Sequence, residues 1–283
     1  MLTFIFVFVW LTFVFLQTSK TMLVDFSFCY KLPVNLILGL LFAFLITFII
    51  LVFCLVLMTF LPHNHYFKGF VSRSLSRFVN RFLRIKVVVR NPHLIPSKEN
   101  VVIYANHKSY TDPFVITSVI PRTLSFAPKQ NFNCFFGTAW FLKLAFLSLD
   151  CMVISRDDIR KTAQNLIKAV PKVKNGMAMV VFPEGGIKDR NNEQAMPLLG
   201  GAFKIACKSK SSILPLTIKG ASQIKNKRFW QKKVVEIIIH PPLKYDHYCN
   251  TNMHQVAIDV QNIINSSFNQ NNYILTYFDV IIK

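Results

Sequence analysis

An uncharged apolar segment near the N-terminus constrains the fold of this 283-residue chain more than any other feature. Residues 36–61 form a run of 26 residues without a charged side chain, and a helix of that length is about 39 Å long. Because the hydrocarbon core of a bilayer is about 30 Å thick, this run predicts a transmembrane helix that crosses with some tilt. Residues 1–16 are equally apolar but shorter, and they lack the basic start and the small-residue cleavage site of a secretory signal. They predict a second helix, spanning or half-inserted, so that residues 1–66 form a membrane anchor.

Charge is distributed unevenly along the chain. Residues 1–67 carry only Lys20, Asp25 and Lys31, so all but one of the 20 net positive charges lie after residue 67. A strongly basic region attracts polyanions, which could be nucleic acid, an anionic membrane surface or a phosphorylated substrate. The anchor favours the membrane, and the aromatic residues stand in apolar runs without the basic interleaving of a nucleic-acid stacking platform. By the positive-inside rule, the region after the anchor is predicted to lie in the cytoplasm.

Residues 67–85 predict an amphipathic helix at the membrane surface. Basic side chains recur at intervals of three to five residues from Lys68 to Arg84, while Phe and Val side chains fall on a different helical face. Directly after a membrane span, this pattern favours a helix that lies in the headgroup layer. An ordinary surface helix of the following domain would show the same pattern.

The remainder of the chain, residues 86–268, reads as an α/β domain, because short β-branched runs alternate with helical periodicity. We expect a mixed, largely parallel sheet covered by helices, followed by a tail at 269–283. The predicted strands are 86–90, 101–105, 124–127, 151–155, 178–182, 213–218 and 234–240. The predicted helices are 113–120, 133–148, 157–174, 197–208 and 252–268.

The six cysteines are scattered along the chain, without a CxxC pair or a histidine at ligand spacing. This pattern predicts reduced thiols, and it predicts neither a metal site nor a disulfide framework.

A candidate site follows the predicted strand VVIYA, where the sequence continues NHKSYTDPF. Asp112 is placed to cap the helix that Pro113 opens, so the loop from His107 to Asp112 is short and held at both ends. Such a loop can bring the carboxylate onto one imidazole nitrogen and leave the other nitrogen free to accept a proton from a substrate. His254 and Asp259 have the same spacing, but they fall within a predicted helix, where positions five apart do not face one another.

A second candidate segment is FPEGG at 182–186, which follows the apolar run AMVV. Two consecutive glycines allow backbone N–H groups to approach a phosphate closely. Arg190 follows the same loop, and Arg156 ends another predicted strand with a guanidinium suited to bidentate phosphate binding. A tight turn and solvated surface charges would explain each of these features equally well when taken alone.

Four short segments occur in a fixed order: NHKSYTD, ISR, FPEGG and ILPL. As an ordered set they resemble the four-block signature of the glycerolipid acyltransferase family, which includes 1-acylglycerol-3-phosphate acyltransferase. The resemblance covers about residues 85 to 240. Two positions depart from the usual pattern: Gly186 stands where Thr or Ser is common, and Ser155 stands where an acidic residue is common.

The resemblance implies a role for each matching residue. His107 would be the catalytic base and Asp112 would orient it, while Pro215 would lie on the acyl-donor side or contribute to packing. The implied substrate-binding residues are Lys129, Arg156, Glu184, Gly185 and Gly186, to which the sequence adds Arg190.

The implied activity is transfer of a fatty acyl group from a thioester to the free hydroxyl of 1-acylglycerol 3-phosphate, giving phosphatidic acid for phospholipid biosynthesis. The expected partners are lysophosphatidate, the bilayer and an acyl-CoA or acyl carrier protein thioester, with no further cofactor, no metal and no nucleic acid. Ser109 lacks the GxSxG setting of a nucleophile, so we expect it to cap the loop. The alternatives are a different acceptor, such as glycerol 3-phosphate or another lysophospholipid, and a non-catalytic tethered protein that binds anionic lipid.

Overall fold

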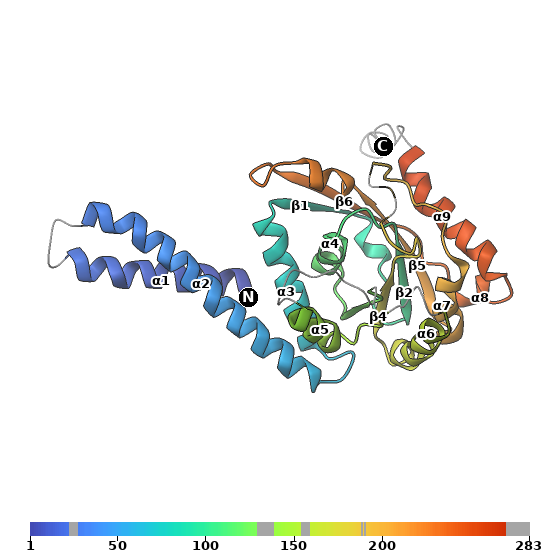
Figure 1. The fold of residues 1–283 in the computed structure, drawn as a ribbon. Helices are drawn as coiled ribbons and strands as arrows, with labels where there is room; N and C mark the ends of the chain where they lie inside the picture. The colour runs from blue at the N-terminus through green and yellow to red at the C-terminus, as the bar shows by residue number, and fades with distance from the viewer. Residues whose placement is uncertain (23–27, 129–138, 154–158, 188, 190, 270–283) are drawn as a thin grey trace, which may run out of the picture.

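The computed structural model describes residues 1–22, 28–128, 139–153, 159–187, 189 and 191–269. A pair of long helices projects from a body in which helices cover both faces of a twisted sheet (Figure 1). The chain therefore divides into a projecting pair of helices and a body.

The projecting pair consists of α1 (Leu2–Met22) and α2 (Phe28–Thr59), which pack against each other along their length. Both are long and apolar enough to cross a membrane. The indole N–H of Trp10 donates to the carbonyl of Leu36, and Gly39 lets α1 approach closely, because a Cβ there would lie 3.0 Å from the Trp10 ring. Their outward faces are apolar and exposed, which is stable only where lipid covers them. The first helix runs six residues beyond the predicted 1–16.

The next helix, α3 (Tyr66–Phe82), joins the anchor to the body. Val71 is buried in an apolar cluster with Leu55 and Met58 of α2 and Leu2 of α1. On another face, the side chain of Asn80 donates to the carbonyl of Phe114 in α4 (Asp112–Val119). The sequence assigned the apolar face of this segment to the bilayer, but much of that face is covered by α1 and α2.

The body contains a six-stranded sheet in the order β1-β6-β5-β2-β4-β3. Among the described strands, β5 and β6 form the one antiparallel pair, so the predicted mixed and largely parallel sheet is confirmed. The strands are β1 (Ile85–Arg90), β2 (Val101–Ala105), β3 (Leu124–Phe126), β4 (Ala178–Val181), β5 (Ser212–Lys219) and β6 (Lys233–Ile239).

One expected strand, 151–155, does not form over its described residues. The N–H of Met152 donates at 2.8 Å to the carbonyl of Phe126, the last residue of β3. Met152 is buried in the core cluster, so the apolar side chain that suggested a strand here packs into the core instead.

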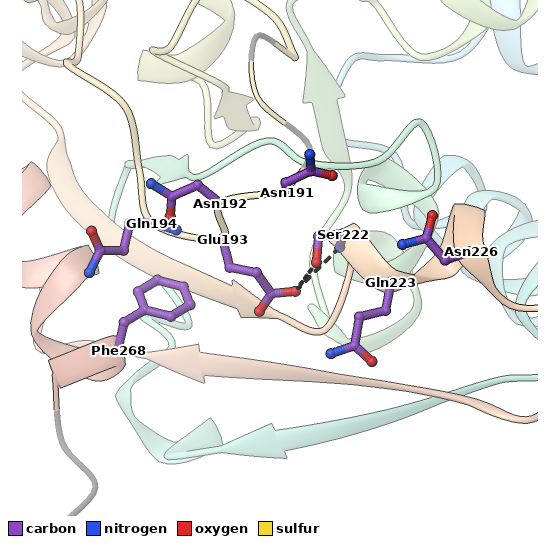
Figure 2. Close-up of a pocket in the computed structure, with 8 residues that line it drawn as sticks. All are labelled: Asn191, Asn192, Glu193, Gln194, Ser222, Gln223, Asn226 and Phe268. Carbon is purple, nitrogen blue, oxygen red and sulfur yellow. Dashed lines mark hydrogen bonds between the residues drawn. The ribbon is translucent and has the colours of Figure 1, made fainter.

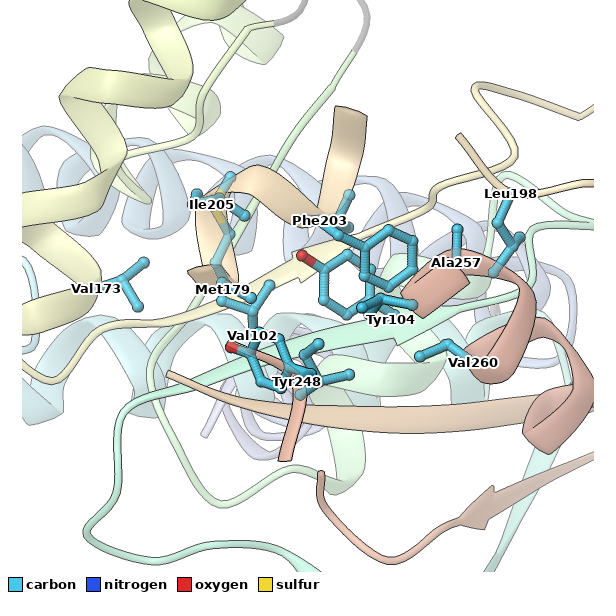
Figure 3. Close-up of a cluster of buried hydrophobic side chains, with 14 of the residues drawn as sticks. Val102, Tyr104, Val173, Met179, Leu198, Phe203, Ile205, Tyr248, Ala257 and Val260 are labelled. Carbon is cyan, nitrogen blue, oxygen red and sulfur yellow. The ribbon is translucent and has the colours of Figure 1, made fainter. Parts of the chain in front are cut away.

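Helices bury both faces of the sheet. On one face, Tyr104 of β2 stacks on Phe203 with ring centroids 4.2 Å apart, within a buried cluster that Val260 of α9 also joins (Figure 3). On the other face, Ile103 packs with Ile116 of α4. The remaining helices are α5 (Ala139–Ser148), α6 (Ile159–Lys174), α7 (Lys204–Ser209), α8 (Tyr245–Tyr248) and α9 (Met253–Asn269), with 3-10 turns η1 (Pro92–Leu94), η2 (Gly200–Phe203) and η3 (Ser222–Asn226).

These helices match the sequence predictions with two differences: the segment 197–208 divides into η2 and α7, and the short α8 was not predicted. Residues 133–138 and 157–158 of two expected helices, and residues 270–283 of the expected tail, lie outside the described part of the chain.

A partly buried carboxylate links the end of the anchor to the body. Asp150, which follows α5, accepts hydrogen bonds from Lys68 Nζ at 2.6 Å and Lys172 Nζ at 3.0 Å, and lies 2.7 Å from His63 Nδ1. The side chain of Lys68 is only 2% exposed. Burial opposes ionisation of Asp150, but the hydrogen bonds and charges of Lys68 and Lys172 outweigh it, so the pKa of the carboxyl is lowered.

Replacing this carboxylate should destabilise the chain in a pH-dependent way. Asp150→Asn leaves Lys68 buried without a counter-charge, so we expect the free energy of unfolding to fall by roughly 3 kcal/mol at neutral pH. Because the folded pKa of Asp150 is lowered, its stabilisation is complete above the ordinary pKa of 3.8 and is lost as the pH falls through the lowered value. Thermal denaturation in detergent should therefore show the variant and the wild type converging in strong acid. The exposed Asp246→Asn is the control, and equal stability of Asp150→Asn at pH 7 would contradict the role.

Candidate functional site

The site lies on the loop that follows β2. His107 Nδ1 lies 2.9 Å from Asp112 Oδ2, and the same oxygen accepts the backbone N–H groups of Lys108 and Ser109, each at 2.8 Å. One carboxylate oxygen therefore binds the histidine ring and two backbone amides of the loop. The structure confirms the predicted contact between His107 and Asp112.

The predicted helix cap at Asp112 is wrong. Helix α4 begins at Asp112 itself, and the cap position belongs to Thr111, whose side chain makes no capping bond. The Asp112 carboxylate points back over the preceding loop, where its Oδ2 makes three contacts, while its Oδ1 is buried without a hydrogen-bond partner among the described residues.

The imidazole is held on two sides. Its ring stacks on Phe182, with centroids 4.1 Å apart, and its side chain is 15% exposed while that of Asp112 is fully buried. Because a carboxylate accepts from Nδ1, the neutral ring carries its proton there and presents the Nε2 lone pair. Such a ring can accept a proton from a bound hydroxyl.

Glu184, in the turn after the neighbouring strand β4, supports this loop. Its Oε1 accepts the His107 backbone N–H at 2.9 Å, and its Oε2 accepts from Lys108 Nζ at 3.0 Å. Both side chains of this ion pair are buried. The resemblance placed Glu184 at the substrate, but here both of its oxygens are occupied by protein groups. The parallel pairing of β2 with β4 explains this, because it brings the ends of the two strands side by side.

The two glycines after Glu184 have backbone conformations that other residues rarely adopt. Gly185 has φ +74° and Gly186 has φ +137°. The Gly185 N–H donates to the carbonyl of Phe182 at 3.3 Å, which closes a tight turn, and a Cβ at Gly185 would lie 3.1 Å from the Leu199 side chain. The turn explains why glycine is needed here, and phosphate binding by its backbone stays a prediction.

The other predicted substrate-binding residues, Lys129, Arg156 and Arg190, lie outside the described residues. Pro215 is described and lies buried in β5 opposite Tyr104, which agrees with the packing part of its expected role.

Sequence reasoning missed Asn106, which is buried directly before the histidine. Its Oδ1 accepts the Ile218 N–H at 2.8 Å, and its Nδ2 donates to the carbonyls of Ile218 at 2.8 Å and Glu193 at 3.0 Å. The side chain thereby extends the pairing of β2 and β5 beyond the end of β2. The sequence did contain a signal for Asn106, because a polar residue directly follows a strand made of apolar residues.

A polar pocket of about 730 Å³ adjoins this loop through Glu193 (Figure 2). The Glu193 carboxylate accepts from the Gly220 N–H at 2.8 Å and from Ser222 Oγ at 2.5 Å, so its charge is partly satisfied inside the protein. The lining residues are mostly amides and do not include His107; they are Asn191, Asn192, Glu193, Gln194, Ser222, Gln223, Asn226 and Phe268.

Comparisons with known proteins agree on one chemistry. A family model described as acyltransferase matches residues 86–219. The chain is 30% identical over 215 residues to a probable 1-acyl-sn-glycerol-3-phosphate acyltransferase of Mycoplasma pneumoniae, covering 70% of this chain and 78% of the relative. It is 27% identical over 180 residues to the 1-acyl-sn-glycerol-3-phosphate acyltransferase of Borreliella burgdorferi, covering 62% and 70%.

A solved structure shares the fold. The crystal structure of the 1-acyl-sn-glycerophosphate (LPA) acyltransferase PlsC from Thermotoga maritima superposes with a TM-score of 0.54 at 20% identity. The match covers 78% of this chain and 96% of that one. The likeness supports the fold assignment.

The ion pair between Lys108 and Glu184 yields a prediction about stability. Lys108→Met leaves a buried carboxylate with one backbone partner, so we expect a loss of roughly 3–5 kcal/mol in the free energy of unfolding. Adding Glu184→Gln removes the unpaired charge and should restore much of that loss, a coupling that a double-mutant cycle measures in denaturant titrations. The exposed Lys204→Met is the matched control. Additive effects of the two substitutions would show that the side chains do not act as a pair.

Proposed function

The chain belongs to the 1-acyl-sn-glycerol-3-phosphate acyltransferase family, so it is an O-acyltransferase, and we propose that it transfers a fatty acyl group from an acyl thioester to the free hydroxyl of 1-acylglycerol 3-phosphate. The product is phosphatidic acid, a precursor in phospholipid biosynthesis. The observation that carries the mechanism is the contact of 2.9 Å between His107 Nδ1 and the buried carboxylate of Asp112.

In the proposed mechanism, His107 Nε2 removes the proton of the acceptor hydroxyl as the hydroxyl oxygen attacks the thioester carbonyl. The tetrahedral intermediate then collapses, the carbon–sulfur bond breaks, and the imidazolium returns the proton to the leaving thiolate. Asp112 keeps the ring in the reactive tautomer and stabilises the imidazolium. No acyl-enzyme is required.

Ser109 contributes to the loop in this mechanism. Its hydroxyl lies 2.9 Å from the Thr111 hydroxyl and accepts the Thr111 N–H at 3.2 Å. These contacts support the loop-capping role that the sequence predicts.

Lys108, Glu184 and Asn106 position the histidine without touching the reacting atoms. The first two bind the loop to the turn after β4, and Asn106 binds it to the end of β5. A base held from both neighbouring strands loses little orientational freedom when the acceptor arrives, which is the purpose of preorganisation in catalysis.

We place the acceptor's phosphate beside this loop, with Lys129, Arg156, Arg190 and the backbone of Gly185 and Gly186 as its proposed ligands. The turn at Gly185 and Gly186 supports this placement, because Glu184 directly before it is bonded to the His107 loop. Either donor suits the strongly basic body, since coenzyme A carries phosphates and acyl carrier protein is acidic.

The two apolar helices support association with a membrane. We propose that the body lies on the cytoplasmic side, because nearly all of the positive charge follows the anchor. The acyl chains of both substrates would then reach the site from the adjacent leaflet.

Removal of the base provides the decisive test. His107→Ala should lower kcat by roughly 10²- to 10⁴-fold in membranes supplied with lysophosphatidate and an acyl thioester, because a positioned general base typically contributes that much to the rate. His254→Ala is the matched control, since His254 has the same five-residue spacing to an aspartate but lies exposed on α9. Phosphatidate formation at the wild-type rate by His107→Ala would overturn the mechanism and favour the non-catalytic lipid-binding alternative.

The choice of acceptor has its own experiment. Reconstituted protein incubated with labelled lysophosphatidate should form phosphatidate and should not acylate glycerol 3-phosphate at a comparable rate, with acyl-CoA and acyl carrier protein thioesters tested in turn. A higher kcat/KM for glycerol 3-phosphate or for a lysophospholipid with another headgroup would reassign the acceptor and leave the role of His107 unchanged.

A further inference from the structure

The loop between β5 and β6 exposes large aromatic side chains at the end of the sheet that also carries the His107 loop. It connects Lys219 to Lys233, and the side chains of Phe229 and Trp230 within it are 53% and 62% exposed. Because β2, β4 and β5 are parallel, this loop leaves the sheet at the same edge as the loop of His107. Adjacent exposed aromatic residues on a folded body indicate a surface that contacts something else.

An aromatic path connects this loop to the anchor. The Phe229 ring lies 5.3 Å from that of Phe82, at the end of α3, and Phe82 lies 5.8 Å from Phe44 of α2. Phe44 in turn lies 4.7 Å from Phe6 of α1. In Figure 1 the loop at the end of β6 reaches toward the side from which α1 and α2 project. The exposed aromatic surface is therefore continuous with helices that are themselves built for lipid.

The charge of the loop matches one kind of partner. Between Gly220 and Lys233 the sequence has basic residues and no acidic one, and the basic residues are Lys225, Lys227, Arg228 and Lys232. The Arg228 guanidinium lies 5.5 Å from the centre of the Trp230 ring. Aromatic residues accompanied by Lys and Arg are typical of segments that lie at the boundary between headgroups and acyl chains of an anionic leaflet.

We propose that the β5–β6 loop is a second membrane contact, in which Phe229 and Trp230 insert into the headgroup layer of an anionic bilayer. The proposal rests on the membrane-bound acyltransferase proposed above. The packing of α3 against α1 and α2 attaches the body to the bilayer at one side, and contact through the loop adds a second point of attachment at the end of the sheet that carries His107. The loop thereby helps lipid substrates to reach the site, and it takes no part in the acyl transfer itself.

The first test reads the depth of Trp230 directly. The chain has three tryptophans, so Trp10→Phe/Trp140→Phe leaves Trp230 as the only one. This full-length variant is reconstituted into phosphatidylcholine vesicles containing phosphatidylglycerol, with and without brominated acyl chains. We expect blue-shifted Trp230 emission that brominated lipid quenches. Emission typical of water, unquenched in a sample that transfers acyl groups, would overturn the loop contact and leave the proposed function intact.

The second test separates lipid delivery from chemistry. Phe229→Ser/Trp230→Ser should lower kcat/KM by roughly tenfold in anionic vesicles and leave it unchanged in detergent micelles, where the substrate does not have to be reached within a bilayer. Ile258→Ser, at an exposed apolar position on α9, is the matched control. Equal losses in vesicles and micelles, or no loss in vesicles, would contradict the proposal. A wild-type protein without any transferase activity would instead refute the proposed function, and the quenching of Trp230 would still test the loop.

Discussion

The buried carboxylate of Asp112 is the interaction on which the site depends. One of its oxygens binds the ring of His107 and two backbone amides of the same loop, so a single group determines both the shape of the loop and the tautomer of the histidine. Because burying a carboxylate without hydrogen bonds is costly, the three contacts of Oδ2 favour the conformation of the loop that makes them. The base is therefore oriented before any substrate binds.

The same principle recurs at two other points, where a buried or partly buried carboxylate joins segments distant in sequence. Glu184 binds the His107 loop to the turn after β4, and Asp150 binds the segment after the anchor to α3 and α6. In each case a nearly buried lysine, Lys108 or Lys68, supplies the positive charge. Some of the chain's basic residues therefore stabilise ion pairs inside the body. Others lie on the surface, where positive charge suits phosphates and anionic lipid.

Much of the fold was predictable because its signals are local. The strand at 101–105 was placed correctly, since a short run of apolar residues bounded by polar ones describes a strand buried on both faces. The segment 151–155 has a similar composition, but over its described residues it does not form a strand, and Met152 packs into the core while its N–H bonds to the last residue of β3. Composition reports burial, but it does not report whether the backbone continues into a ladder.

The sequence by itself determined the membrane anchor, the α/β body and the contact of His107 with Asp112, because each arises from hydrophobic periodicity or from groups within a few residues of one another. Only the tertiary structure decided that Glu184 faces Lys108, a partner 76 positions away, and not the substrate. It also decided that Asn106 joins β2 to β5, and that Phe82 meets the β5–β6 loop. These contacts exist because strand order and helix packing bring distant segments together, and neither is encoded in the spacing of neighbouring residues.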